Sequence, residues 1–399
     1  MYLPRLLAGT LKKALSLFPA VMVTGPRQSG KTTFLLHEFG KECDYVTFDD
    51  PLERNFALAD PHGFLNRFQK RPVILDEIQY VPEILPYLKM RIDKRREETG
   101  KWLLTGSQQF QLMKNVSESL AGRIALLELP PFSLLEMKQG ASVSLESILW
   151  VGGYPEPAIH PAKRELWIRS YIQTYLERDV RQLLNVKDLR GFETFLGLCA
   201  AMHGQTFNAA TLARKCGVSL PTIKAWAGVL EASFLCRFLL PYFNNYGKRL
   251  VKTPKFYFID PAIVCALTRQ PSGEAAIAGP MGGALFEGLI MSEAYKVFAA
   301  YGRSADIFFW RSNDGLEVDL IVQIGHRLCP VEIKLTATPT LKHLEPLSRF
   351  ARLVGKEVVG TGLLVCRVEA KKVLPGGVLA LPWQEFPAWL EDQVKVLDI

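Results

Sequence analysis

The chain has 399 residues, of which 48% are hydrophobic and 22% are charged, with a formal net charge of +8. This length predicts two or three domains, and the composition is typical of a soluble globular protein. Since there is no uninterrupted apolar run long enough to cross a bilayer, we expect no membrane partner. The positive charge permits a polyanionic partner but does not by itself demonstrate one.

Both the N-terminus and the cysteines favour a cytoplasmic protein. The segment MYLPRLLAGTLKKALSLFPA lacks the long apolar core of a secretory signal and predicts an amphipathic helix, with Lys12 and Lys13 on its solvated face. The seven cysteines form no CxxC pair, and most lie in apolar runs. That pattern predicts buried free thiols in a reducing compartment.

Residues 19–130 alternate short apolar runs with helical patterns. The runs are near-continuously apolar, as expected of strands that are covered on both faces. They are AVMVTG (20–25), YVTFDD (45–50), PVILDE (72–77), WLLTGS (102–107) and IALLELP (124–130), with helices expected over 31–39 and 84–98. This alternation predicts an α/β domain with a parallel sheet.

The first strand leads into a phosphate-binding pattern, G-x-x-x-x-G-K-[ST]. Its residues, with the following threonine, are the predicted nucleotide-binding set: Gly25, Pro26, Arg27, Gln28, Ser29, Gly30, Lys31, Thr32 and Thr33. Glycines allow backbone N–H groups to curl round a phosphate, and the helix N-terminus favours its negative charge. We expect Lys31 to reach the β- and γ-phosphates of ATP and Thr32 to bind Mg²⁺.

An acid pair ends a neighbouring buried strand, in Val73-Ile74-Leu75-Asp76-Glu77. Asp76 is predicted to hold the Mg²⁺ shell, and Glu77 to orient and polarise the attacking water. The next strand is followed by Ser107 and Gln108, and either is a candidate sensor of the γ-phosphate. Together these features predict an ATPase with ATP and Mg²⁺ as cofactors.

The segments GPRQSGKTT, VILDEIQ, LLTGSQQF and SLAGR resemble the AAA+-type ATPases of bacteria and archaea that carry a C-terminal domain of unknown function. The resemblance covers essentially the whole chain. It implies that Arg123 is an arginine finger or sensor, and a finger would act across the interface of a homo-oligomer, such as a ring. The alternative is a structural arginine that caps a strand.

The middle of the chain is predicted to be helical and then to form a winged helix. TFNAATLARKCGVSLPTIKAWAGVLE (206–231) has a helix-turn-helix pattern with Ser219 as N-cap, and two apolar strands flank a turn after it. A set of basic residues, with Tyr246 among them, would face DNA: Lys224, Lys248, Arg249, Lys252 and Lys255. A module for protein contacts remains the alternative.

The C-terminal region has the order helix (284–300), strands (306–310, 316–323, 328–333), helix (341–354) and strand (361–366). This order is that of restriction-endonuclease-like folds, the PD-(D/E)xK class. Asp319 and Glu332 would share a Mg²⁺, Lys334 would position or deprotonate water, and Glu287 would complete the metal shell. Val318 replaces the usual proline before the aspartate. The alternatives are a structural ion pair or a catalytically silent DNA-binding relic.

These patterns predict an ATPase domain (1–157), a helical and winged-helix domain (158–280) and a restriction-endonuclease-like domain (281–399). The leading hypothesis is an ATP-driven enzyme that binds and processes DNA, with branched or junction, mobile-element and foreign DNA all open as substrates. A nucleotide-switched DNA- or protein-binding regulator with a silent nuclease-like domain is the second hypothesis. An ATPase that remodels another protein is the third.

Overall fold

The computed structural model describes residues 2–106, 116, 118–137, 143–175, 189–243, 252–355 and 359–396. These residues form two compact units. The first comprises Met1–Phe132 with Ala232–Phe234 and Ala299–Arg303, and the second comprises Ser133–Glu231, Leu235–Phe298 and Ser304–Ile399. Residues 133–157, which we assigned to the ATPase domain, therefore fall in the second unit. The division into three domains stays a prediction.

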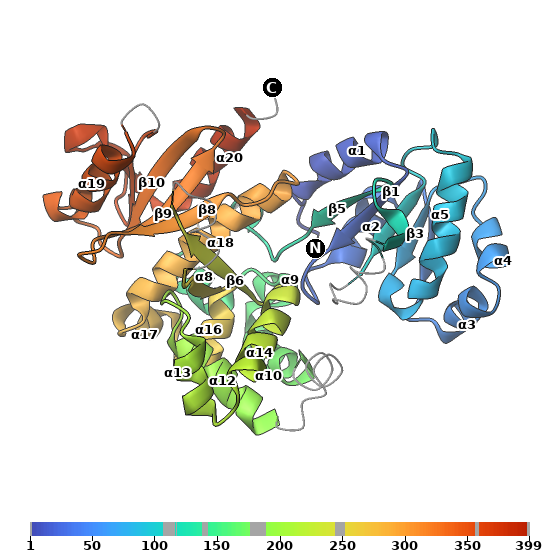
Figure 1. Cartoon of the computed structure of the whole chain (residues 1–399), viewed down its shortest axis with the longest axis horizontal. Helices are drawn as coiled ribbons and strands as arrows, with labels where there is room; N and C mark the ends of the chain where they lie inside the picture. Colours follow the sequence, from blue (N-terminus) through green and yellow to red (C-terminus); the bar gives the residue numbers. More distant parts are fainter. Residues whose placement is uncertain are drawn as a thin grey trace. The chain divides into compact units, whose positions relative to one another are not determined.

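A five-stranded parallel sheet organises the first unit (Figure 1). Its strands lie in the order β2-β3-β4-β1-β5. They are β1 (Ala20–Thr24), β2 (Asp44–Thr47), β3 (Val73–Asp76), β4 (Trp102–Thr105) and β5 (Ile124–Glu128). All five predicted strands are confirmed, and every residue of β1, β3 and β4 is buried. This burial explains why these strands show no alternation of apolar and polar residues.

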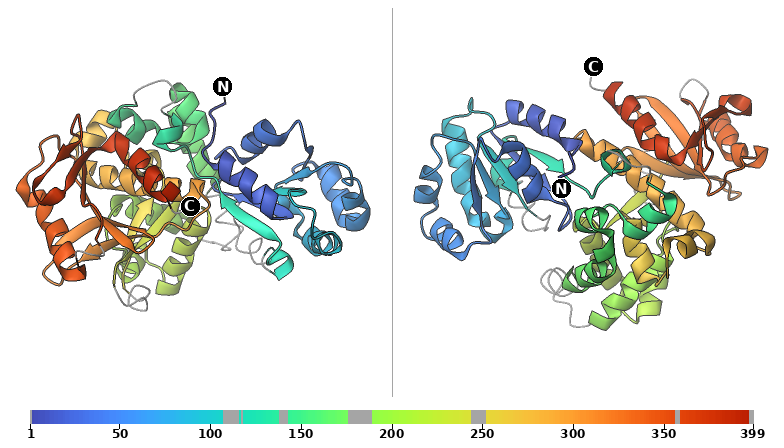
Figure 2. Two further views of the ribbon diagram at one scale, coloured as in Figure 1. Left: turned by 90° about the horizontal axis from the view of Figure 1, so that it is seen from above. Right: turned by 180° about the vertical axis from the view of Figure 1, so that it is seen from behind.

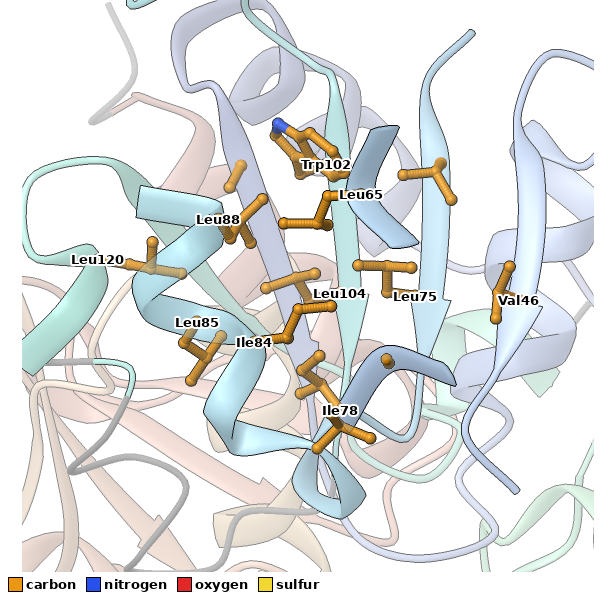
Figure 3. Packing of buried hydrophobic residues seen from close by; sticks show 14 of the residues in the cluster. Val46, Leu65, Leu75, Ile78, Ile84, Leu85, Leu88, Trp102, Leu104 and Leu120 are labelled. Atoms are coloured by element: carbon orange, nitrogen blue, oxygen red, sulfur yellow. The ribbon is translucent and has the colours of Figure 1, made fainter. Parts of the chain in front are cut away.

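Helices cover both faces of this sheet, and the two views in Figure 2 show the same layering. One core joins Val21, Val23 and Leu103 to α1 (Leu7–Leu17) and α2 (Lys31–Phe39). The other lies under α3 (Pro51–Ala59), α4 (Pro61–Asn66) and α5 (Leu85–Lys94). Figure 3 shows the side chains of α5 facing Leu75 and Leu104 in this second core. The short 3-10 helices Ile78–Tyr80 and Pro82–Ile84 precede α5.

The N-terminal segment forms the expected amphipathic helix. Leu7, Leu11 and Ala14 are buried on one side of α1, whereas Lys12 and Lys13 are exposed on the other. The cysteines also behave as predicted, because all seven are free and all but Cys216 are buried. Among the described residues, no helix is both long and apolar enough to cross a bilayer.

The second unit begins with helices, as predicted for the middle of the chain. They are α7 (Leu134–Met137), α8 (Leu145–Val151), α9 (Pro155–Ile159), a 3-10 turn (Pro161–Lys163), α10 (Arg164–Tyr175), α12 (Leu189–Ala201), α13 (Ala209–Cys216), α14 (Leu220–Ala232), α16 (Pro261–Leu267) and α17 (Gly273–Ala278). Between α13 and α14, Gly217 has φ +67°, a left-handed conformation that glycine adopts at low cost. The Ser219 Oγ accepts from the Thr222 N–H at 3.2 Å, so the predicted N-cap is confirmed.

An eight-stranded sheet runs through the rest of this unit in the order β12-β13-β11-β10-β9-β8-β6-β7. Its strands are β6 (Cys236–Pro241), β7 (Lys255–Phe258), β8 (Ile307–Arg311), β9 (Glu317–Ile324), β10 (Arg327–Ile333), β11 (Leu363–Cys366), β12 (Lys372–Val373) and β13 (Leu379–Pro382). The antiparallel pair β6–β7 follows α14, and β6 also pairs in parallel with β8. The strands expected to form a wing therefore belong to the same sheet as the C-terminal strands.

The predicted C-terminal order is confirmed at the level of secondary structure. Helix α18 (Gly282–Ala300) precedes β8, β9 and β10, and these are followed by α19 (Glu345–Val354) and β11. A 3-10 turn, Leu341–Leu344, occupies the first part of the helix predicted over 341–354. Further 3-10 turns cover Pro375–Gly377 and Trp383–Glu385, and α20 (Phe386–Lys395) follows. Strand β10 is antiparallel to β9 and parallel to β11.

Candidate functional site

The motif Gly25–Thr32 spans the loop between β1 and α2 and the first residues of α2, and two glycines shape the loop. Gly25 has φ +141°, and a Cβ atom there would lie 2.3 Å from the Leu129 carbonyl oxygen. Gly30 has φ +88° and is the N-cap of α2. A side chain would be strained at both positions. The loop thus ends at a helix N-terminus, where free N–H groups and the helix dipole favour an anion.

Lys31 is buried at the start of α2 and bends back over the loop. Its Nζ donates to the Gly25 carbonyl oxygen at 3.2 Å and to the Pro26 carbonyl oxygen at 2.9 Å. Burial lowers the pKa of Lys31 to about 8, although the carboxylates of Glu77 and Asp76 oppose this shift. Two neutral carbonyls are weak partners for a buried ammonium group, and phosphate oxygens would be stronger ones.

The other predicted residues of this motif differ in burial and in backbone conformation. The charge of Arg27 contributes to the lowered pKa of Lys31, and Gln28 has the left-handed φ of +59°. The Ser29 side chain is fully buried, and its Oγ has no hydrogen-bond partner among the described residues. Thr33 is exposed on the first turn of α2. The unpartnered Ser29 hydroxyl is consistent with a loop that accommodates a polar ligand.

Asp76, at the end of β3, gathers hydroxyl groups from three other elements. Thr32 Oγ1 donates to its two oxygens at 3.0 and 2.9 Å, and Tyr45 Oη donates to Oδ2 at 3.0 Å. Thr105 Oγ1, at the end of β4, also donates to Oδ1. Burial and the Asp76 carboxylate raise the pKa of Tyr45 to about 12, so its hydroxyl remains a donor. The hydroxyl of Thr32 and the carboxylate of Asp76 are the kind of oxygen ligands that Mg²⁺ prefers.

Glu77 follows in the left-handed conformation, with φ +58°. Such a conformation is uncommon outside glycine, asparagine and aspartate, and strained residues of this kind cluster at functional sites. The Glu77 N–H donates to Thr105 Oγ1 at 3.0 Å, and the Glu77 Oε2 atom accepts from Gln79 Nε2. Thr105 therefore connects both acids to β4, and Gln79 holds the carboxylate of Glu77.

Sequence reasoning missed Tyr45, Thr105 and Gln79. The candidates predicted after β4 were Ser107 and Gln108, and both lie outside the described residues. Thr105 is the last residue of β4, so a search for polar residues at the carboxyl ends of parallel strands would have found it. Tyr45 could not be found in this way, since it is only the second residue of its strand.

Arg5 is a further residue that the sequence did not single out. Its side chain is 5% exposed. Nη1 donates to the Ser29 carbonyl oxygen at 3.0 Å, and Nη2 donates to the Pro130 carbonyl oxygen at 2.5 Å. Its guanidinium carbon also lies 4.8 Å from the centre of the Phe132 ring. Arg5 thus ties the phosphate-binding loop to the segment that follows β5.

Arg123 forms a two-point ion pair within the first unit. Its Nε lies 2.7 Å from Asp93 Oδ1, and its Nη2 lies 3.0 Å from Asp93 Oδ2. Nη1 donates to the Ala121 carbonyl oxygen at 2.9 Å. These contacts tie the arginine before β5 to α5. Its role as an arginine finger stays a prediction.

The basic residues predicted to face DNA are placed differently from one another. Lys224 on α14 is exposed, and so is Lys252 ahead of β7. Lys248, Arg249 and Tyr246 lie outside the described residues. Lys255 does not belong to a basic surface: it is buried, and its Nζ lies 2.8 Å from Glu287 Oε1 and 2.5 Å from Glu317 Oε1. Lys255 is the first residue of β7, whose four residues are all buried, and a buried lysine needs acidic partners.

Asp319 on β9 and Glu332 on β10 come together with Lys334, which directly follows β10. Lys334 Nζ lies 2.9 Å from Asp319 Oδ2 and 2.6 Å from Glu332 Oε1. The Ile333 N–H also donates to Asp319 Oδ2 at 2.8 Å. Burial opposes the charge of Lys334, but the two carboxylates outweigh it and raise the pKa of this lysine. The predicted three-residue cluster is therefore present as an ion-paired group.

Glu332 is a buried acid whose pKa is strongly shifted. Burial, followed by the charge of Asp319, raises its pKa to about 8. Its Oε2 atom is buried and has no partner among the described residues. A carboxylate oxygen with no partner, next to a second carboxylate, suits a divalent cation.

Glu287 projects from α18 toward β7 and not into a shared shell with the other two acids. Its Oε1 contacts Lys255 Nζ at 2.8 Å and accepts from Tyr257 Oη at 2.5 Å. Burial raises the pKa of Glu287 despite Lys255, and the charge of Glu287 adds to the raised pKa of Glu332. Across the described part of the chain, no three acidic, histidine or cysteine side chains lie close enough to hold one metal ion.

Comparison with known families divides the chain into three stretches. Residues 17–138 match the model of an AAA domain, residues 142–274 match a domain of unknown function (DUF8612), and residues 282–386 match another domain of unknown function (DUF4143). The AAA stretch contains the loop, Asp76, Glu77 and Arg123.

Two curated mycobacterial proteins are similar to most of the chain. The uncharacterized protein Rv2008c of Mycobacterium tuberculosis is 33% identical over 342 residues, which cover 84% of this chain and 74% of that protein. The uncharacterized protein Mb2031c of Mycobacterium bovis matches with the same values.

Two solved ATP-related structures align with part of the chain. The Walker-type ATPase PABY2304 of Pyrococcus abyssi aligns with a TM-score of 0.43 and 15% identity, covering 65% of this chain and 94% of that one. AMPPCP-bound DnaA from Aquifex aeolicus aligns with a TM-score of 0.32 and 16% identity, covering 57% and 84%. The loop geometry, the acid-tipped strand and the family matches lead to one conclusion: the chain belongs to the family of Rv2008c and Mb2031c, and it carries an AAA-type P-loop ATPase domain.

Proposed function

We propose that this protein hydrolyses ATP at the loop between β1 and α2 and uses the hydrolysis cycle to act on DNA. The observation that carries the proposal is the convergence of four side chains at one edge of the parallel sheet. Lys31 and Thr32 begin α2, Asp76 ends β3, and the Thr32 hydroxyl contacts the Asp76 carboxylate at 2.9 Å. Glu77 follows directly. This edge is where open α/β sheets bind ligands.

Each residue has a distinct task in the proposed reaction. Lys31 exchanges its two carbonyl partners for phosphate oxygens, which places a positive charge where negative charge develops. Glu77, oriented by Gln79 and by its own strained backbone, accepts a hydrogen bond from the attacking water. Thr32 and Asp76 would hold Mg²⁺, which neutralises phosphate charge when bound. Thr105 links the Asp76 carboxylate to the backbone of Glu77, since its hydroxyl donates to Asp76 Oδ1 and accepts from the Glu77 N–H.

The proposed action on DNA depends on the second unit. The consecutive helices α13 and α14, the tight turn at Gly217 and the strand pair β6–β7 follow one another as in a winged helix. Thr206 forms a bridge to Lys255, which adds a short third strand segment next to this pair. Lys224 and Lys252 are exposed there and would contact phosphates. A module for protein contacts remains the competing proposal for these elements.

The ion-paired group on β9 and β10 supports a nuclease-like role for the C-terminal region. Asp319 and Glu332 would hold the metal, and Lys334 would position water at the scissile phosphate. The buried, unpartnered Oε2 of Glu332 supports the metal assignment. The contacts of Glu287 favour a supporting role, in which it neutralises Lys255 and leaves the metal to the other two acids.

The decisive experiment measures ATP hydrolysis, DNA binding and DNA cleavage by the full-length protein on duplex, forked and junction DNA. We expect DNA-stimulated hydrolysis that Lys31→Ala abolishes, and Mg²⁺- or Mn²⁺-dependent cleavage that Asp319→Ala abolishes without loss of hydrolysis. Binding should weaken steeply as salt is added. Hydrolysis without any DNA binding would overturn the DNA proposal and favour an ATPase that remodels proteins. DNA binding with no cleavage in either metal would favour the nucleotide-switched regulator.

A further inference from the structure

A cavity of about 820 Å³ in the second unit lies among helices α8, α10, α12 and α16. Helices α10 and α12 both pack on α16, and Figure 1 shows these helices grouped below the sheet of this unit. Its size falls within the range of about 300–1,000 Å³ that small-molecule sites occupy. The apolar part of its wall includes Trp150, Ile168, Ile172 and Leu196. No step of the proposed ATPase or nuclease reaction uses this cavity.

Arg164, the first residue of α10, lines the same cavity. Its side chain is only 5% exposed. Nε donates to the Trp150 carbonyl oxygen at 2.8 Å, and the guanidinium carbon lies 3.4 Å from the centre of the Trp150 ring. Nη2 is buried and has no hydrogen-bond partner among the described residues. The guanidinium is thus held in one orientation by its Nε and by the indole ring, with a donor left over.

This arrangement is costly unless a ligand compensates for it. A guanidinium group stays protonated in proteins, so Arg164 places a permanent positive charge beneath apolar walls. Burial lowers its pKa, and the nearby acidic side chains of Glu165 and Asp260 offset only part of that effect. Burying a charge without a hydrogen-bonded counter-ion is unfavourable. An anionic group in the cavity would supply the missing counter-charge.

The rim of the cavity is polar and mixed in charge. Arg169 and Arg269 are exposed there, together with Glu165 and Glu193. Arg169 pairs with Glu165 at 3.4 Å, so part of the rim is already neutral. The rim therefore admits a charged molecule without strongly attracting one, and the unsatisfied positive charge lies deeper, at Arg164.

We propose that this cavity binds a small organic anion, whose apolar body lies against Ile168, Ile172 and Leu196 and whose head group pairs with Arg164. A carboxylate and a phosphate would both supply the counter-charge, because each carries negatively charged oxygens that pair with guanidinium groups. The apolar walls require an apolar body, which excludes inorganic phosphate or a simple sugar phosphate as the preferred ligand. The site lies in the stretch that matches a domain of unknown function, and it is independent of the nucleotide loop.

The test is a titration of the full-length protein with three probes that share one apolar body: 2-naphthoate, 2-naphthyl phosphate and the uncharged 2-naphthylmethanol. A charge-assisted hydrogen bond raises binding affinity by about tenfold or more. We therefore expect one of the two anions to bind at least about tenfold more tightly than the alcohol. The tighter anion identifies the head group. Lys31→Ala should bind both anions as the wild type does, which separates this site from the nucleotide loop.

Two variants locate the bound probe. Arg164→Met removes the charge, and Ile172→Trp fills the cavity while leaving Arg164 in place. Circular dichroism shows whether Arg164→Met folds, and Ile172→Trp still tests the site if it does not. Each should weaken anion binding at least about tenfold. Arg169→Met, at the rim, should change it less than about threefold. The proposal is overturned if the alcohol binds as tightly as the anions, if Ile172→Trp has no effect, or if no probe binds at millimolar concentration. It is likewise overturned if an acidic aromatic peptide binds and the free anions do not.

Discussion

Replacing Arg5 by methionine tests whether this buried arginine controls the phosphate-binding loop. Methionine keeps an apolar chain against Phe132 but removes the donors to the Ser29 and Pro130 carbonyl oxygens. A hydrogen bond from a charged donor contributes about 1.5–3 kcal/mol, so two such bonds set an upper limit of about 6 kcal/mol. Removing a buried guanidinium also removes its desolvation cost, which reduces the expected loss of unfolding free energy to about 3 kcal/mol.

The assay is urea-induced unfolding of the first unit, followed with and without a non-hydrolysable ATP analogue and Mg²⁺. We expect the Arg5→Met variant to lose about 3 kcal/mol without nucleotide, and its dissociation constant for the analogue to rise about tenfold, because the carbonyl of Ser29 is no longer held. Analogue at a hundredfold excess over the variant's dissociation constant should stabilise the variant by about 2.7 kcal/mol through mass action. This gain offsets part of the loss relative to the nucleotide-free wild type.

A matched control separates this role from the general effect of losing an arginine. Arg67 makes a two-point contact with Glu53, but both side chains are partly exposed. Arg67→Met should therefore cost less than about 1 kcal/mol and leave nucleotide binding unchanged. The reasoning about Arg5 is refuted if Arg5→Met unfolds within about 0.5 kcal/mol of the wild type and binds the analogue with unaltered affinity.

Three further predictions concern single side chains. Glu77→Gln should lower the ATP hydrolysis rate about a hundredfold or more in a phosphate-release assay while nucleotide affinity stays within about twofold; equal losses of rate and affinity would contradict its role toward water. Tyr45→Phe removes one hydrogen-bond donor from Asp76 and should lower the Mg²⁺ concentration needed for half-maximal hydrolysis about threefold. The control Tyr87→Phe, on an exposed face of α5, should leave this concentration unchanged. An unchanged Mg²⁺ requirement in Tyr45→Phe would count against the contact. Burial lowers the pKa of His203 to about 3, so this histidine is neutral when folded, and the unfolded state binds more protons between pH 3 and pH 6.5. Stability should therefore fall as pH decreases through this window, by about 2 kcal/mol at pH 5, in wild type but not in His203→Asn; parallel pH profiles of the two proteins would refute it.

The strands of the first sheet and the C-terminal elements up to β11 were predictable because their signals are local, whereas β12 and β13 of the second sheet were not predicted. The buried strands β1, β3 and β4 are short apolar runs between turn residues, and the loop after β1 needs glycine at Gly25 and Gly30 for its backbone angles. The C-terminal order of helix and strands follows from the same kind of pattern. In each case the chain's own hydropathy and backbone preferences decide the outcome, independently of what packs nearby.

The partners of the acidic residues were not predictable, because they come from segments far apart in the chain. Lys255 reads as one basic residue among several, yet the fold buries it between Glu287 and Glu317. Asp76 acquires the hydroxyls of Tyr45 and Thr105 only because β2, β3 and β4 lie side by side. A hydrogen bond depends on register and rotamer, and neither is encoded by the type of a single residue.

The sequence by itself determined the nucleotide loop, the acid-tipped strand beside it and the α/β character of both ends of the chain, since these depend on local spacing and on hydrophobic periodicity. Only the tertiary structure decided that Arg5 holds the loop through Ser29, that Gln79 and Thr105 position Glu77, and that Arg164 lines a cavity with its Nη2 unpartnered among the described residues. The physical reason is that the energy of a buried polar group depends on which partners and how much water surround it, and folding brings those partners from distant parts of the chain.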